Sequence, residues 1–109
     1  DYNELSALFD HLLENNKFSK EMENLLIYKK ALLISNVVDE LKLLESIKPL
    51  LNTETLWKSH ALLLLGDYYA SKEEYIKAKE FYQKIFIIKN LHNDLYKQAG
   101  TKLAAITNE

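Results

Sequence analysis

The chain has 109 residues, 48% of them hydrophobic and 28% charged, which is enough for one domain with a hydrophobic core and excludes a disordered chain. All 14 basic residues are lysines and the net charge is −2. The chain therefore lacks the arginine guanidinium that binds phosphate through two hydrogen bonds, and we expect no nucleic acid as partner. Cysteine is absent, which excludes disulfides, thiol catalysis and zinc–thiolate sites.

Apolar residues recur at three- and four-residue spacing in the first half of the chain, which predicts three helices. The first covers residues 3–16. Ser19 is expected to cap a second helix that runs to about Ile34. Asn36, with Asp39 three residues on, is expected to cap a third helix, and Pro49 should weaken or kink its last turn.

The second half of the chain predicts three more helices. Asn52 and Thr53 should start the fourth. Ser71 and Glu74 have the spacing of a capping box, which predicts that the fifth helix begins there and continues to about Phe86. A break at residues 90–93 precedes a sixth helix at 92–107.

The two glycines, Gly66 and Gly100, are 34 residues apart, which is the period of a tetratricopeptide repeat. Gly66 followed by Tyr69, and Ala78 followed by Tyr82, match the small and aromatic positions of that repeat. Small residues at 66 and 78 would let two antiparallel helices approach closely, with the tyrosines filling the gaps beside the contact. We therefore predict an all-α, right-handed superhelical solenoid of about six antiparallel helices.

The repeat also organises the start of the chain. Residues 1–16 superpose at a constant offset on the helix that begins at Tyr75, so they resemble the second helix of a truncated repeat. The predicted organisation is a single tetratricopeptide-like domain over 1–109, divided into that half repeat at 1–16, a degenerate repeat at 20–51, a good repeat at 54–89 and a closing helix at 92–107.

No constellation of catalytic residues is evident. His11, His60 and His92 fall on three different predicted helices, and the pair His11 and Glu14 alone suits a helix surface better than a metal. A glycine-rich phosphate loop and a nucleophile elbow are both missing. We therefore predict no enzyme, no catalytic residue, no cofactor and no metal.

In a tetratricopeptide solenoid the first helix of each repeat lines the concave side, and this predicts a groove for a protein or peptide partner. The alternative is that its residues are merely solvated helix positions. A second hypothesis is self-association, as a homodimer through exposed terminal helices, and a third is an enzyme fragment. We expect no direct membrane contact by these residues. The predicted groove residues are Tyr28, Leu32, His60, Leu63, Asp67, Lys97 and Thr101.

Several phrases together carry a more specific resemblance: "LLESIKPLL", Trp57, "ALLLLGDYYASKEEYIKAKEFYQKI" and "LYKQAGTKLAAI". Nearly the whole chain resembles the tetratricopeptide-like domain of the bacterial ancillary SecYEG translocon subunit, related to cell-division coordinators, most closely as it occurs in obligate intracellular bacteria. The resemblance implies an N-terminal membrane anchor outside this sequence and a domain on the periplasmic side of the inner membrane. It also implies a scaffold or ancillary role through contacts with translocon components and chaperones.

Overall fold

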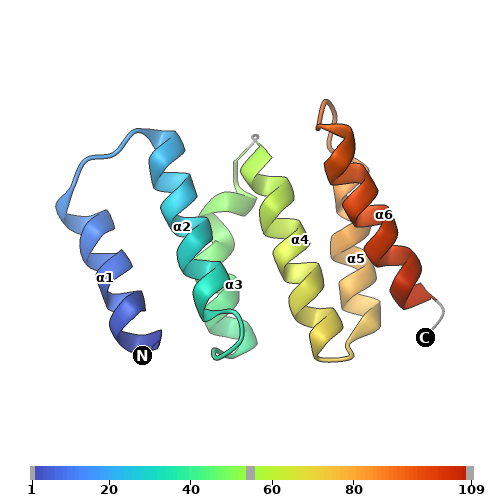
Figure 1. Ribbon diagram of the computed structural model, residues 1–109, viewed down its shortest axis with the longest axis horizontal. Coiled ribbons are helices and arrows are strands. Elements are labelled where there is room, and N and C mark those ends of the chain that lie inside the picture. The colour runs from blue at the N-terminus through green and yellow to red at the C-terminus, as the bar shows by residue number, and fades with distance from the viewer. Residues whose placement is uncertain (1, 54–55, 108–109) are drawn as a thin grey trace. The chain divides into compact units, whose positions relative to one another are not determined.

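The computed structural model describes residues 2–53 and 56–107, and this part of the chain is helical with no strand (Figure 1). The predicted all-α fold is confirmed. Contacts divide the chain into two compact units, residues 1–57 (unit 1) and residues 58–109 (unit 2). The right-handed superhelix and the repeat boundaries stay predictions. The helices are α1 Tyr2–Asn15, α2 Lys20–Ile34, α3 Glu40–Leu51, α4 Leu56–Ser71, α5 Tyr75–Ile85 and α6 Asn93–Thr107.

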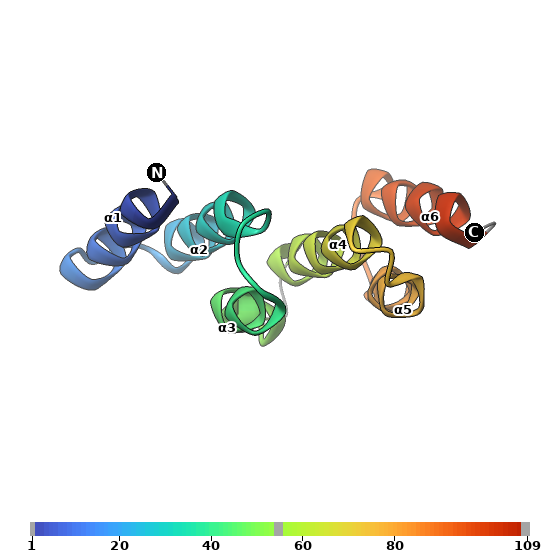
Figure 2. The ribbon, with the colours of Figure 1, turned by 90° about the horizontal axis from the view of Figure 1, so that it is seen from below.

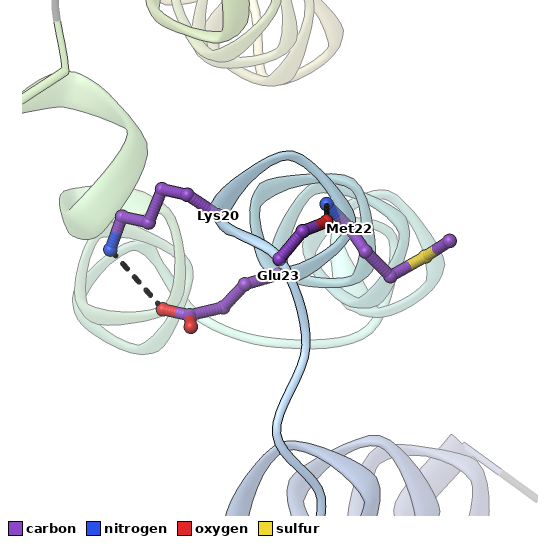
Figure 3. Close-up of polar contacts among 4 residues, drawn as sticks. Lys20, Met22 and Glu23 are labelled. Carbon is purple, nitrogen blue, oxygen red and sulfur yellow. Dashed lines mark hydrogen bonds and ion pairs between the residues drawn. The ribbon is translucent and has the colours of Figure 1, made fainter.

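The start of α2 agrees with the sequence. Ser19 is its N-cap, and the Ser19 Oγ accepts a hydrogen bond from the Met22 amide at 3.2 Å. Lys20 and Glu23 form an ion pair at 3.3 Å across the same turn (Figure 3). The cap satisfies an amide that has no partner within the helix, so the predicted Ser19 cap is confirmed.

The start of α3 differs from the prediction. Its N-cap is Asp39, whose Oδ1 accepts from the Lys42 amide at 2.9 Å, and the expected Asn36 cap is wrong. The Ile34 carbonyl accepts the amides of both Val37 and Val38, and these bonds keep this stretch as a turn that closes α2. Pro49 lies in the last turn of α3, which continues to Leu51.

Asn52 and Thr53 also have a different role from the predicted one. Asn52 is the C-cap of α3, and the Thr53 hydroxyl donates to the Leu50 carbonyl at 2.8 Å. Both residues therefore end α3, and α4 begins at Leu56. Apolar residues at helical spacing form the core of unit 1: Ala31, Ile34, Leu43, Ile47 and Leu50, each 2% exposed or less.

In unit 2, successive helices run in opposite directions and are joined by turns at alternate ends (Figures 1 and 2). The turn between α4 and α5 is not a capping box. Ser71 is the last residue of α4, and its hydroxyl donates to the Tyr68 carbonyl at 2.6 Å. Glu74 precedes α5 without a side-chain cap, and Glu73 has a left-handed φ of 61°.

Two backbone bonds explain this turn. The Glu74 amide donates to the Tyr69 carbonyl at 2.9 Å, and the Glu73 amide donates to the Ala70 carbonyl at 3.0 Å. This is the Schellman pattern that closes a helix, with Glu73 in the position that usually holds glycine. The turn therefore satisfies the end of α4 through the backbone, and Ser71 is not available to cap α5.

Candidate functional site

The predicted close contact between α4 and α5 is present at Gly66. A Cβ added to Gly66 would lie 2.3 Å from Cε1 of Tyr82, so the tyrosine ring occupies the space that a side chain would need. Ala78, the second small residue of the pattern, is fully buried. Beside this contact the rings of Tyr69 and Phe81 stack, with centroids 5.4 Å apart and planes 8° from parallel. The two helices therefore pack as the repeat pattern predicts.

The Tyr82 ring also positions the carboxylate of Asp67. The Tyr82 hydroxyl donates to Asp67 Oδ1 at 2.6 Å. Burial raises the pKa of Tyr82 well above its usual value, and the hydrogen bond and negative charge of Asp67 raise it further. Tyr82 is therefore a neutral donor at physiological pH, and its hydrogen bond holds the Asp67 side chain in place.

The partner of Asp67 on α6 is Lys102. Its Nζ lies 2.9 Å from Oδ1 and 3.1 Å from Oδ2 of Asp67. Asp67 thus joins α4 to α5 through a hydrogen bond and α4 to α6 through an ion pair. The predicted groove contains both Asp67 and Lys97, but the lysine that reaches Asp67 is Lys102.

Lys97 and Thr101 lie one turn apart on α6 and are both exposed. Together they line an open hollow along this helix, with Asp94, Gln98 and Lys102. Lys102 belongs to both the hollow and the Asp67 ion pair, so Asp67, Lys97 and Thr101 share one region of unit 2. Lys102 was missed by the sequence analysis. The repeat period could have indicated this residue, since Lys102 follows Asp67 by one period and one residue.

The other predicted residues of α4 are less accessible. Leu63 is buried, with 7% of its surface exposed, so it is not the accessible groove residue that the sequence predicted. His60 is half-buried, and this burial lowers its pKa, which favours the uncharged imidazole. Both lie on α4 before Asp67. Of the predicted residues on α4, Asp67 is therefore the one that offers a charged group.

Tyr28 and Leu32 lie one turn apart on α2, in unit 1. The Tyr28 ring is half-buried and tilted against Trp57, with centroids 6.0 Å apart, and the Trp57 Nε1 donates to Glu21 Oε2 at 3.1 Å. Leu32 is 48% exposed. The seven predicted groove residues therefore fall into two sets, one in each unit, and the set of unit 2 contains the pair Lys97 and Thr101.

Within residues 2–53 and 56–107, histidine and carboxylate side chains do not gather in groups of three or more that could hold a metal ion. Over the same residues, every helix is too short or too polar to cross a membrane. Comparisons of the chain with protein-family models, with curated proteins and with solved structures gave no match.

Proposed function

We propose that this chain is a non-catalytic protein–protein interaction module of the tetratricopeptide type. The observation that supports the proposal is the Gly66–Tyr82 contact, in which the small residue of α4 meets the aromatic residue of α5 at the two positions that the repeat pattern singled out. In such solenoids the first helices of successive repeats share a concave face that binds extended or helical segments. Here those helices are α4 and α6, and the ion pair from Asp67 to Lys102 joins them.

The chemistry of the face favours an acidic segment as partner. Lys102 is neutralised by Asp67, whereas Lys97 is exposed and forms no ion pair with a described residue. Thr101 adds an exposed hydroxyl one turn away. A carboxylate of the partner could pair with Lys97 while a neighbouring polar group bonds to Thr101, and charge-assisted hydrogen bonds of this kind are the stronger ones.

The biological setting is proposed from the sequence resemblance alone. It is that of a scaffold or ancillary factor at a bacterial translocon or envelope complex, on the periplasmic side of the inner membrane. A membrane anchor outside this sequence would hold it there. The partners would then be protein segments, with no nucleic acid and no direct contact of these residues with lipid.

A displayed library of random peptides, panned against the purified chain, tests the binding face. We expect enrichment of peptides with acidic residues, and loss of their capture by Lys97→Glu and by Thr101→Ala. The matched control is Lys89→Glu, which makes the same charge reversal at an exposed position in the turn after α5. Equal capture by Lys97→Glu and Lys89→Glu, with unchanged melting temperatures, would place binding elsewhere or exclude it.

Self-association is the second candidate function. It is favoured by one specific observation, the line of exposed leucines on α1. The two functions use different helices in different units, because Lys97 is on α6 and the leucines are on α1. Variants of each can therefore be tested separately.

A further inference from the structure

The hollow along α6 is lined by polar and charged residues of a single helix face. Starting from Asp94, the lining continues with Lys97 and Gln98 one turn on, and with Thr101 and Lys102 two turns on. Lys97 therefore lies between Asp94 and Lys102 along the helix. The charges at these two ends determine which acidic groups can reach Lys97.

At one end of the hollow, the charge of Lys102 is already neutralised within the molecule. Its Nζ lies 2.9 Å from Oδ1 and 3.1 Å from Oδ2 of Asp67. The Tyr82 hydroxyl donates to the same Oδ1 at 2.6 Å, so a residue of α5 fixes this carboxylate in place. Asp67 thus occupies the position beside Lys102 that a carboxylate of a partner would otherwise take.

At the other end of the hollow lies the carboxylate of Asp94, in the first turn of α6, where the helix dipole favours an acidic residue. Its Oδ2 lies 3.5 Å from Nδ1 of His92, but that nitrogen accepts a hydrogen bond from the Asp94 amide at 3.2 Å and so has no proton to give to the carboxylate. Among the described residues, no lysine forms an ion pair with Asp94. A second acidic group of a partner would meet a like charge at this end.

We infer that the hollow takes one isolated carboxylate at Lys97, and that Asp67 sets this limit by keeping Lys102 occupied. The inference rests on the proposed peptide-binding function and narrows its ligand to a segment with a single Asp or Glu flanked by uncharged residues. Lys97 is exposed and pairs with no acidic group of the described residues, so its charge is free for that carboxylate. Gln98 and Thr101, both exposed, offer hydrogen bonds to the uncharged groups beside it.

Paired acids are disfavoured because they would need a second cation. The same holds for a phosphorylated side chain, which carries roughly two negative charges. Lys102 could supply that cation only by leaving Asp67, whose own charge would then lie unpaired near the ligand. An isolated carboxylate avoids this exchange, so Asp67 acts as a specificity-determining residue by making the competing ligand unfavourable.

The displayed peptide library tests the inference on the parent chain when the enriched peptides are sorted by the number and spacing of their acidic residues. We expect peptides with one isolated Asp or Glu to be enriched over peptides with two adjacent acids. Enrichment of no acidic peptide would overturn the proposed function, and this inference with it. Equal or greater enrichment of adjacent acids would overturn this inference alone.

Asp67→Asn tests the role of Asp67, because the amide keeps an acceptor for the Tyr82 hydroxyl but frees Lys102. The probes are an enriched peptide with a single acid and its analogue with Glu at the next position, and fluorescence anisotropy measures both dissociation constants. Their ratio should shift towards the analogue by about two- to fivefold, the range for an exposed ion pair. The control is Glu80→Gln, which removes the same charge from an exposed residue of α5. An equal shift in both variants would overturn the role of Asp67.

A double variant separates the freed lysine from a change in structure. When Asp67→Asn is combined with Lys102→Gln, the second cation is gone, so the ratio of the two dissociation constants should return to that of the parent. A structural effect of Asp67→Asn would not be reversed by removing Lys102. A double variant that keeps the ratio of Asp67→Asn would therefore overturn the inference.

Discussion

Residue 66 lies so close to Tyr82 that a Cβ there would stand 2.3 Å from Cε1 of the ring and 2.8 Å from Cζ. Non-bonded carbon atoms are optimally about 3.5 to 4.0 Å apart, so a side chain at 66 would require the ring to move. Tyr82 is only 2% exposed, and its hydroxyl is bonded to Asp67. The ring is therefore held at both ends, and glycine is the residue that fits opposite it.

Gly66→Ala should destabilise the chain despite the higher helix propensity of alanine. Overpacking a well-filled contact costs roughly 1 to 3 kcal/mol, which exceeds the gain of about 1 kcal/mol from replacing glycine in a helix. Gly100→Ala is the control, because a Cβ at Gly100 would meet its nearest neighbour at an ordinary 3.9 Å. We expect Gly100→Ala to be neutral or stabilising in urea denaturation. Similar free energies of unfolding for the two variants would contradict the role assigned to Gly66.

A second substitution separates the clash from other effects at Gly66. Tyr82→Leu removes the ring that opposes residue 66 and is itself expected to destabilise the fold. In that background the added cost of Gly66→Ala should become smaller, because the atoms that would clash are gone. An unchanged cost would mean that the two residues are not coupled.

The sequence could not distinguish the two glycines, although it identified their spacing. Gly66 and Gly100 occupy the same repeat position, so the repeat period predicts the same role for both. They differ in the side chain that the neighbouring helix places opposite each, a tyrosine ring at 2.3 Å for Gly66 and the edge of Phe86 at 3.9 Å for Gly100. That neighbour is a property of tertiary packing, which a local pattern does not contain.

Helix boundaries show the same division between local and tertiary information. The Ser19 cap was predicted correctly because its hydroxyl bonds within its own turn, to the Met22 amide three residues on. Asn36 and Asp39 both have the chemistry of a cap, and the choice between them depends on how far the turn after α2 extends. Ser71 and Glu74 have capping-box spacing, but α4 continues through Ser71.

Glu73 provides a prediction from that turn. With a φ of 61° it holds a left-handed conformation, which costs a residue with a Cβ roughly 1 to 2 kcal/mol, and glycine avoids this cost. Glu73→Gly should therefore raise the free energy of unfolding by about 0.5 to 1 kcal/mol, after allowing for the flexibility of glycine in the unfolded chain. Thermal or urea denaturation measures the change.

Two controls define the cause. Glu74→Gly makes the same substitution at the next residue, whose φ is −91°, and should not stabilise the chain. Asn90→Gly, at the second left-handed position with a φ of 64°, should stabilise less than Glu73→Gly because asparagine tolerates this conformation. If Glu73→Gly proved no more stable than Glu74→Gly, strain at Glu73 would be excluded as the explanation.

The candidate binding face was predicted in part. Asp67, Lys97 and Thr101 follow from the helical spacing and the repeat period, and the structure places them in one region of unit 2. The pairing of Asp67 with Lys102 depends on the rotation of α6 about its own axis. The repeat period maps Asp67 onto Thr101, one residue before Lys102, so the period alone did not indicate the lysine that pairs with Asp67.

The last prediction concerns Tyr82 at alkaline pH. Its pKa is raised in the fold above the usual 10.0, so the folded state favours the protonated phenol. This contribution is fully present below pH 10 and is lost as the pH rises towards the folded pKa, because the unfolded chain ionises first. Tyr82→Phe should therefore cost roughly 0.5 to 1.5 kcal/mol at pH 7, through the lost hydrogen bond to Asp67, and this cost should shrink above pH 10. Urea denaturation of the parent and Tyr82→Phe at matched pH values measures the difference in their free energies of unfolding. Titration of the lysines, which both chains share, cancels in this difference.

A second variant, Asp67→Asn, keeps an acceptor for the Tyr82 hydroxyl but removes the charge. Its free energy of unfolding should decline less steeply above pH 10 than that of the parent. A stability difference between parent and Tyr82→Phe that stayed constant from pH 7 to beyond pH 10 would show that Tyr82 ionises no differently in the fold than in the unfolded chain.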